Sequence, residues 1–373
     1  MPRVLFIFGT RPEAIKLCPL IRCMRDGFDV RVCITAQHRE MLDQVLNVFE
    51  VRPGHDLGAM RPRQTLFGAT ASILAGLEPV LAVEEPDMAV VQGDTSTTLC
   101  GALGAFYAGV PVAHVEAGLR TGNMKSPFPE EMNRVMVSRL AALHFAATQG
   151  AAENLAAEGV SREAIAVTGN TGIDALHHIV RLLDRRCVES GRDWHAIAGG
   201  RKLIAVTAHR RESFGAAFDS ICAAVKRLAE RGDCVLVYPV HPNPNVAGPA
   251  RRHLENCKNV LLTDPLDYIT FVDLMRHAHI VLTDSGGVQE EAPSLGKPVI
   301  VLRENTERPE AVHAGTVRMS GADSDAIVRM TAELLDDPVE YIRRSRIHSP
   351  YGDGQACHRI AARMKGFFEQ RLS

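Results

Sequence analysis

The sequence lacks the long apolar runs that cross membranes, since no stretch approaches the roughly 20 apolar residues that a bilayer-spanning helix needs. It also lacks a secretion signal. Met1, Pro2 and Arg3 are followed only by the short apolar run 4–8, without a longer apolar stretch or a small-residue cleavage site. We therefore expect a cytoplasmic protein with no membrane partner.

The cysteine patterns of a disulfide framework or a zinc site are also missing. The nine cysteines are an odd number and are scattered, and no CxxC pair or Cys/His cluster occurs. We expect reduced thiols in the core and no bound metal ion.

A long basic run is absent as well, and the formal net charge is -2 at pH 7 with a pI near 6.7. This balance does not favour a nucleic-acid partner. Arginine is nevertheless abundant, with 35 arginines against seven lysines. Arginine suits bidentate recognition of phosphate and carboxylate groups, so a local anionic ligand stays open, although genome composition explains the same bias.

What the sequence does have is the length for two domains and the alternation of an α/β fold. At 373 residues the chain exceeds the roughly 250–300 residues at which one hydrophobic core stops growing. Short β-rich runs alternate with longer helical patterns, which predicts βα units and parallel sheets. The predicted strands are 4–8, 29–35, 88–92, 112–116, 203–207, 234–240, 260–263, 280–283 and 299–302.

The alternation lapses between residues 169 and 201, where a helical stretch leads into a polar, glycine-containing segment. We therefore predict a first domain of residues 1–170 plus 355–373 and a second domain of residues 171–354. Ligands of open parallel sheets collect outside the carboxyl ends of the strands. The active site should thus face the cleft between the two domains.

The first predicted strand runs into the segment GTRPEAIK at residues 9–16. Gly9 permits a tight turn, Pro12 suits the first helical turn, and Arg11 and Lys16 supply two cations, so the segment is suited to an anion. It matches neither GxGxxG nor GxxxxGK[ST], which argues against a dinucleotide or ATP site here. An ordinary strand-to-helix turn with surface cations is the alternative.

Acidic residues follow the predicted strands of the first domain. Asp94 and Glu116 end successive apolar strands, which places two carboxylates at one edge of the sheet, and Glu130 begins a helical pattern. Paired carboxylates in such a position suit proton transfer. Each acid also has a structural alternative, since Asp94 could cap a helix and Glu130 could favour a helix N-terminus. Glu116 could pair with Arg120 or Arg134.

Two predicted strands of the second domain each lead into a histidine, His209 or His241. A lone histidine is more often structural, but the continuation of His209 into Arg210 and Arg211 just beyond a strand favours phosphate contact. Arg308 is a further cation that either extends into the cleft or belongs to an exposed charged loop.

The strongest local signal is the segment VLTDSGGVQEEA, which reads as an apolar strand, a Ser-Gly-Gly turn and then a helix. The backbone amides of Ser285, Gly286 and Gly287 could cradle a diphosphate, and Glu291 could accept hydrogen bonds from ribose hydroxyls. A simple serine N-cap with glycines for the turn is the alternative.

Taken together, these segments resemble the non-hydrolysing UDP-N-acetylglucosamine 2-epimerase family over nearly the whole chain. One departure is Gln92, which stands where many relatives have histidine. The strings that carry the resemblance are GTRPEAIK (9–16), TAQHREMLDQ (35–44), HVEAGLRTG (114–122), PEE (129–131), HRRE (209–212), DSGGVQEEAPSLGKP (284–298) and YGDG (351–354).

The resemblance implies a GT-B-like α/β fold, with two Rossmann-like parallel-sheet domains facing across a cleft. It implies a homodimer that interconverts UDP-N-acetylglucosamine and UDP-N-acetylmannosamine with no NAD, metal or other cofactor. Asp94, Glu116 and Glu130 would be the catalytic acids, and His209 would help to neutralise the leaving diphosphate. The residues expected to contact UDP or the sugar are Arg11, Lys16, Arg134, Arg210, Phe271, Ser285, Gly286, Gly287, Glu291 and Arg308.

Bacterial members of this family can be activated by UDP-N-acetylglucosamine at a second, adjoining site. The residues of this chain that resemble parts of that site are Gln37, Gln44, Arg63, Glu131, Arg211 and His241.

The mechanism that the resemblance implies is elimination, because the C2 proton lies beside an acetamido group and direct deprotonation has little stabilisation. A carboxylate removes the C2 proton while UDP leaves from C1, and UDP then returns to the glycal with protonation on the opposite face. We hypothesise that Asp94 and Glu130 serve the two faces while Glu116 binds or assists.

Four alternatives share much of this sequence pattern. The first two are a hydrolysing 2-epimerase, which releases UDP and N-acetylmannosamine, and a 2-epimerase of a UDP-2,3-diacetamido uronic acid. A GT-B glycosyltransferase and a non-catalytic UDP-sugar sensor are the others. The presence of all three acids argues against the last two.

Overall fold

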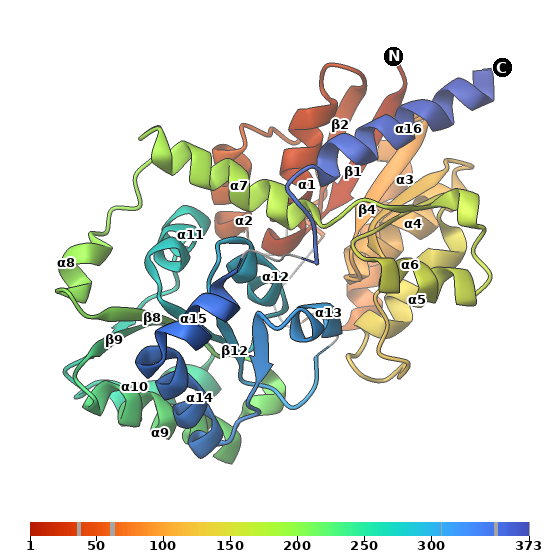
Figure 1. Cartoon of the computed structure of the whole chain (residues 1–373). Coiled ribbons are helices and arrows are strands. Elements are labelled where there is room, and N and C mark those ends of the chain that lie inside the picture. The colour runs from red at the N-terminus through yellow and green to blue at the C-terminus, as the bar shows by residue number, and fades with distance from the viewer. Residues whose placement is uncertain (36–38, 60–63, 307, 347–349, 373) are drawn as a thin grey trace. The chain divides into compact units, whose positions relative to one another are not determined.

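The protein is described from a computed structural model, which covers residues 1–35, 39–59, 64–306, 308–346 and 350–372. The chain forms two compact units, Met1–His177 with Tyr351–Ser373, and His178–Pro350. Each unit is built on a parallel β-sheet accompanied by helices (Figure 1).

In the described part of the first unit, seven strands form one sheet in the order β3-β2-β1-β4-β5-β6-β7, and neighbouring strands are parallel. Since β1 pairs with both β2 and β4, the strand order reverses between β1 and β4, as in the Rossmann fold. The elements are β1 (Arg3–Phe8), α1 (Arg11–Met24), β2 (Asp29–Ile34), α2 (Arg39–Val48), β3 (His55–Asp56), α3 (Leu66–Glu84), β4 (Met88–Gln92), α4 (Ser96–Tyr107), β5 (Val112–Ala117), α5 (Glu130–Leu140), β6 (Leu143–Ala146), α6 (Gln149–Ala157), a 3₁₀ helix (Arg162–Ala164), β7 (Ile165–Val167) and α16 (Ala356–Leu372). Helix α7 (Thr171–Asp184) belongs to both units, because the boundary falls after His177.

The second unit repeats this topology, and its described residues form six parallel strands in the order β10-β9-β8-β11-β12-β13. Here the order reverses between β8 and β11. The elements are α8 (Trp194–Ala198), β8 (Lys202–Thr207), a 3₁₀ helix (Arg211–Ser213), α9 (Ala216–Glu230), β9 (Cys234–Pro239), α10 (Pro244–Leu254), β10 (Val260–Thr263), α11 (Tyr268–His277), β11 (Ile280–Thr283), α12 (Gly286–Ser294), β12 (Val299–Val301), α13 (Pro309–His313), β13 (Val317–Met319), α14 (Ser324–Asp336) and α15 (Pro338–Ser345).

The central strands read as continuous apolar runs because they are buried on both faces. Every residue of β1 from Val4 to Phe8 is fully buried, and so is every residue of β11 from Ile280 to Thr283. In the first unit, α1 and α4 both pack against β1. The polar groups of each sheet are therefore concentrated in the loops at the strand ends.

Helix α1 begins with a capping box. The Thr10 side chain accepts a hydrogen bond from the Glu13 amide, the Glu13 side chain accepts one from the Thr10 amide, and Pro12 lies in the first turn. The C-terminal helix α16 packs against α1 (Figure 1). The start of α1 is thus well defined directly after β1.

The predicted α/β fold class and all nine predicted strands are confirmed, with bounds that differ by one residue at most. The sequence analysis missed β3, β6, β7 and β13. Strands of two to four residues carry little pattern, and β3, β6 and β13 also include a charged residue or a histidine, so they lack the apolar runs by which the equally short β10, β11 and β12 were predicted.

The expectation that no apolar run approaches the length of a membrane span is wrong for α3. This helix has 19 residues, its most apolar window has a mean hydropathy of 1.7, and only 28% of that window is buried. By its length and composition alone, α3 is long and apolar enough to cross a membrane. Phe67 on this helix is 90% exposed, so α3 leaves apolar surface uncovered.

The nine cysteines, all within the described residues, are free thiols. Six of them are buried, while Cys23 and Cys257 are half-buried and Cys187 is exposed. The prediction of reduced core thiols therefore holds for most of the cysteines.

Candidate active site

The polar residues of interest lie where the strand order of each sheet reverses. In the first unit the loops after β1 and β4 begin with Gly9 and Gly93, and the second of these loops carries Asp94. In the second unit the corresponding loops follow β8 and β11 and carry His209 and Asp284. Open α/β sheets bind ligands at this switch point, outside the carboxyl ends of the strands.

Glu116 is the buried carboxylate of the first unit's switch point, with 8% of the residue exposed. Its Oε2 accepts hydrogen bonds from Lys16 Nζ of α1 and from Gln92 Nε2 at the end of β4. Glu116 has a φ of 62°, at a point where the register between β5 and β6 shifts. A left-handed backbone is costly for a residue with a side chain, so the surrounding contacts must hold it there.

Asp94 is paired with a cation but sits in an environment that favours its neutral form. Its Oδ2 lies 2.7 Å from Arg134 Nη2 of α5, and 28% of its side chain is exposed. Desolvation raises the pKa of Asp94 to about 6, Arg134 opposes that rise, and the charges of Glu116 and Glu130 add to it. Glu116 and Glu130 therefore both lie close enough to Asp94 to affect its pKa.

Glu130 and Glu131 are the first two residues of α5, where carboxylates interact favourably with the helix dipole. Glu130 is half-buried, whereas Glu131 is 1% exposed. Glu131 Oε1 accepts hydrogen bonds from the amides of Thr121 and Gly122, at 2.9 and 3.0 Å. The contacts of Glu131 therefore hold the 121–122 loop, and Glu130 is the acid of this pair that has access to solvent.

From the sequence, Arg120 and Arg134 were both open as partners of Glu116, but the structure gives each of these arginines another partner. Lys16 pairs with Glu116, Arg120 pairs with Glu158 at 2.7 Å, and Arg134 pairs with Asp94. Asp94 is not a helix cap either, because Thr95 is the N-cap of α4. The predicted anion-binding cation Lys16 thus lies in the acid cluster.

In the second unit, Asp284 is fully buried and organises the loop after β8. Its Oδ2 accepts hydrogen bonds from the amides of His209 and Arg210, at 2.6 and 2.7 Å. Its Oδ1 lies 3.6 Å from His209 Nδ1. Burial lowers the pKa of His209, and Asp284 opposes that shift. The His209 ring also stacks on that of His241, with 5.4 Å between the ring centres.

Helix α12 starts directly after Asp284, with Ser285 as its N-cap, and no side chain among the described residues caps it. Such an N-terminus presents free amides and the positive end of the helix dipole. Arg308 is buried beside it and pairs with Glu290 of α12. A Cβ on Gly286 would lie 2.6 Å from Arg308 Nη1, so a side chain at this position would displace the guanidinium.

The remaining predicted residues are spread over several elements. Arg11 begins α1, Gly287 and Glu291 belong to α12, and Phe271 lies half-buried on α11. Of the predicted regulatory set, Gln44 is exposed on α2 and Arg211 is exposed at the start of a 3₁₀ turn, while Gln37 and Arg63 lie outside the described residues.

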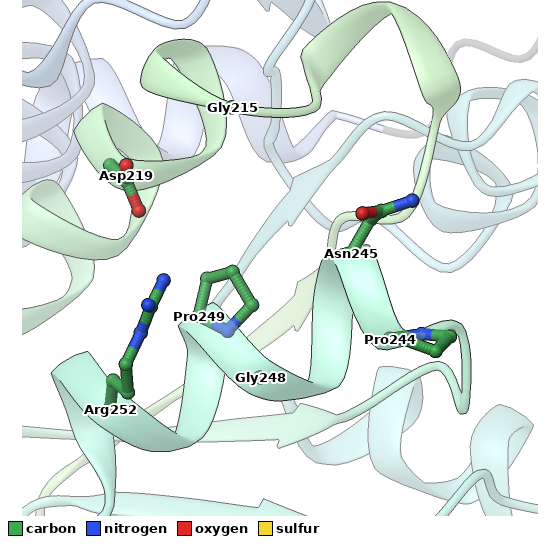
Figure 2. A pocket seen from close by; sticks show the side chains of 7 residues that line it. All are labelled: Gly215, Asp219, Pro244, Asn245, Gly248, Pro249 and Arg252. Carbon is green, nitrogen blue, oxygen red and sulfur yellow. The ribbon is translucent and has the colours of Figure 1, made fainter.

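A separate surface pocket of about 400 Å³ lies between α9 and α10 of the second unit (Figure 2). The Arg252 side chain of α10 points toward α9, which carries Asp219. None of the predicted site residues lines this pocket, so it is distinct from the switch-point residues. The residues that line it are Gly215, Asp219, Pro244, Asn245, Gly248, Pro249 and Arg252.

The sequence analysis missed Gln92 and Asp284 as site residues. Asp284 follows directly after its strand, so the rule that singled out Asp94 and Glu116 would also have found it. Gln92 carried no such signal, because an amide at the end of an apolar strand does not reveal which side chain it will contact. In the described part of the chain no group of three His, Cys, Asp or Glu side chains could hold a metal ion.

The fold and these residues define the chain as a protein with two Rossmann-type units, with an acid cluster at one switch point and an uncapped helix N-terminus at the other. Residues 22–365 match the family described as UDP-N-acetylglucosamine 2-epimerase. The chain belongs to this family, and its two parallel-sheet units make its fold GT-B-like.

Relatives of known name support this assignment over the full length. The UDP-N-acetylglucosamine 2-epimerase of Salmonella typhimurium is 52% identical over 371 residues, which cover 98% of this chain and 99% of the relative. The crystal structure of UDP-GlcNAc 2-epimerase from Neisseria meningitidis bound to UDP-GlcNAc has a TM-score of 0.93 and 44% identity, covering 98% of this chain and 100% of that one. The enzyme of Methanocaldococcus jannaschii in complex with UDP-GlcNAc and UDP has a TM-score of 0.82 and 30% identity, covering 97% and 99%.

Proposed function

We propose that this chain is a non-hydrolysing 2-epimerase that interconverts UDP-N-acetylglucosamine and UDP-N-acetylmannosamine. The observation that carries the proposal is the acid cluster of the first unit, in which Glu116 and Glu130 lie close enough to Asp94 to add to the rise of its pKa to about 6. A carboxylate with such a pKa exchanges protons readily near neutral pH.

The reaction proceeds by elimination and re-addition of UDP. The C2–H and C1–O bonds break, a C1–C2 double bond forms, the proton passes to a carboxylate and UDP leaves with the electron pair of the C1–O bond. Addition of UDP to C1 and of a proton to the other face of C2 gives the epimer. We assign Asp94 and Glu130 to the two faces, and Glu116, paired with Lys16, to binding or assistance.

The second unit holds UDP in this proposal. The uncapped N-terminus of α12 and the buried Arg308 beside it provide amide donors and positive charge suited to a diphosphate. Burial lowers the pKa of His209, and its ring offers a hydrogen-bonding nitrogen to the diphosphate. The acids belong to the first domain and the diphosphate site to the second.

Proton NMR of the purified protein with UDP-N-acetylglucosamine in deuterium oxide tests this function. We expect a new manno anomeric signal, deuterium at C2 of both epimers and UDP still attached to the sugar at equilibrium. Unchanged substrate would rule out the proposal. Free UDP with N-acetylmannosamine would identify a hydrolysing enzyme, and turnover only of a UDP-2,3-diacetamido uronic acid would identify the other alternative.

We further propose that the chain is a homodimer that works in the cytoplasm. Helices α3 and α4 pack together and leave Phe67 90%, Val83 73% and Tyr107 74% exposed, which is the kind of apolar surface that protein interfaces cover. In analytical ultracentrifugation we expect a dimer that Phe67→Glu converts to a monomer. Val339→Glu, at a residue 77% exposed on α15, should leave the dimer intact. A monomeric wild type would overturn the assignment.

The regulatory site also remains a proposal. We expect added UDP-N-acetylglucosamine to accelerate the conversion of UDP-N-acetylmannosamine, and we expect replacement of the exposed Arg211 by alanine to weaken this activation. A rate that is independent of added UDP-N-acetylglucosamine would show that no such site operates.

A further inference from the structure

The loop that carries Asp94 is held through its backbone as well as through the carboxylate. Gly93, which precedes Asp94, has a φ of 74° and donates its amide to the carbonyl of Val115 at 3.0 Å. This joins the loop after β4 to the neighbouring strand β5. The carbonyl groups of Gly93 and Asp94 then each accept a hydrogen bond from a buried side chain.

His114 on β5 holds the first of these carbonyls. Its ring is fully buried, and Nε2 lies 2.7 Å from the carbonyl oxygen of Gly93. A carbonyl oxygen only accepts hydrogen bonds, so Nε2 must carry the proton. Burial lowers the pKa of His114 to about 3, so the ring is neutral and has this one proton to donate. Its Nδ1 is buried without a hydrogen-bond partner among the described residues.

Asn133 on α5 holds the second carbonyl. It is 2% exposed, and its Nδ2 lies 2.8 Å from the carbonyl oxygen of Asp94. The next residue of α5, Arg134, reaches the Asp94 carboxylate. Glu130 lies three residues before Asn133 and therefore on the same side of the helix. The contacts of α5 thus set the position of one proposed acid relative to the other.

A third contact holds the residue after Asp94. Thr95 Oγ1 donates to Glu13 Oε1 at 2.8 Å, and Glu13 is 2% exposed. The same Glu13 accepts from the amides of Gly9 and Thr10 through Oε2. The residues on both sides of Asp94 are therefore tied to three different elements, β5, α5 and α1.

We propose that His114 and Asn133 are positioning residues, which hold the backbone on either side of Asp94 so that its carboxylate and that of Glu130 stay aligned with C2 of the sugar. This inference rests on the proposed role of Asp94 as an acid–base group. Misplacement of a reacting group by about 1 Å can cost roughly 100-fold in rate, which sets the scale of the expected effect.

The test compares variants that differ in whether they can donate the hydrogen bond. His114→Met removes the donor and His114→Gln retains an amide donor on a side chain of similar length, while Asn133→Leu removes the donor of α5. We expect kcat to fall about 10- to 100-fold in His114→Met and Asn133→Leu, with KM within about threefold of wild type. His114→Gln should recover to within about fivefold of the wild-type kcat.

A matched control variant and a pH profile distinguish the proposed positioning role from a purely structural role. His144 lies opposite His114 in β6, is 1% exposed, and has its pKa lowered by burial to about 4. His144→Met should lower thermal stability about as much as His114→Met and leave kcat unchanged. The positioning variants should also shift the acid limb of kcat/KM, because Asp94 moves relative to Arg134, whereas His144→Met should not.

Asp94→Asn, measured in parallel, separates this inference from the function on which it rests. If Asp94→Asn keeps wild-type C2 exchange, the assignment of Asp94 fails, and the positioning proposal fails with it. If Asp94→Asn is inactive but His114→Met and Asn133→Leu keep kcat within twofold of wild type, only the positioning proposal fails. Equal losses of kcat in His114→Met and His144→Met would also overturn it. Should His114→Met not fold, Asn133→Leu decides by the same criteria.

Discussion

The two switch points of this molecule share a topology and differ in chemistry. Both units have the strand order of the Rossmann fold, and in both an aspartate follows the strand at the reversal, Asp94 after β4 and Asp284 after β11. Asp94 pairs with an arginine, and 28% of its side chain is exposed. Asp284 is fully buried, and one of its oxygens accepts two backbone amides.

The difference shows how one topology serves two tasks. The carboxylate of Asp94 has a raised pKa and access to solvent, so it is available to exchange a proton. The carboxylate of Asp284 instead accepts the amides of the loop that carries His209, so it holds that loop in place. The position of an acid at a strand end therefore does not define its role, whereas its hydrogen-bond partners do.

The largest effect should come from removing the acid of the first unit. Asp94→Asn should lower kcat by about 10²- to 10⁴-fold, the usual contribution of a general acid or base. UDP affinity should stay within about threefold of wild type, because UDP is assigned to the second unit. Loss of C2 deuterium exchange by NMR and UDP titration by calorimetry measure the two effects. An equal loss of UDP affinity would contradict the division between the units.

The complementary experiment changes the proposed diphosphate site of the second unit. Gly286→Ala should weaken UDP binding about 10- to 100-fold, because the added Cβ would displace Arg308 from the start of α12. Gly287→Ala is the control for folding, since no atom lies within 4 Å of the Cβ that it would add. Gly287→Ala should melt close to the wild type, whereas Gly286→Ala should lose some stability because it disturbs the buried Arg308–Glu290 pair. Unchanged UDP affinity in Gly286→Ala would remove the diphosphate assignment.

A smaller effect, on stability, should distinguish Asp284 from an ordinary surface aspartate. Asp284→Ala leaves the amides of His209 and Arg210 without their acceptor, which should cost about 1–3 kcal/mol of unfolding free energy. Asp325→Ala, which removes an exposed partner of Arg227 in the same unit, should cost less than about 1 kcal/mol. Urea denaturation measures both, and equal losses would show that Asp284 does not organise its loop.

The smallest effect is a shift in pH dependence. If Asp94 must be ionised to remove the C2 proton, kcat/KM should fall about tenfold per pH unit below pH 6, because its pKa is raised to about 6. Arg134 lowers the pKa of Asp94, so Arg134→Met should move this acid limb to higher pH. A limb that stays in place would mean that another group limits the rate. Asp94→Asn, if any activity remains, should lack the limb.

Much of the fold and part of the site could be predicted from the sequence. The apolar strands and the residues that follow them depend on local patterns, so the sheets and the strand-end positions of Asp94, Glu116 and Ser285 could be predicted. Four short strands were missed, three of which include a charged residue or a histidine and so lack the continuous apolar run that marked the other short strands. The partners of the acids were also missed, since Lys16 lies 100 residues from Glu116 and Asn133 lies 39 residues from Asp94.

The amino-acid sequence specifies the class of each element and the polar residues that end the strands, because hydrophobic periodicity and turn chemistry are local properties. It also carried the family resemblance. Which of those polar residues have buried partners depends on the three-dimensional fold. A carboxylate becomes an acid–base group or a structural anchor through desolvation and through the donors that contact it. Those donors come from strands and helices that are distant in sequence and meet only in the folded sheet.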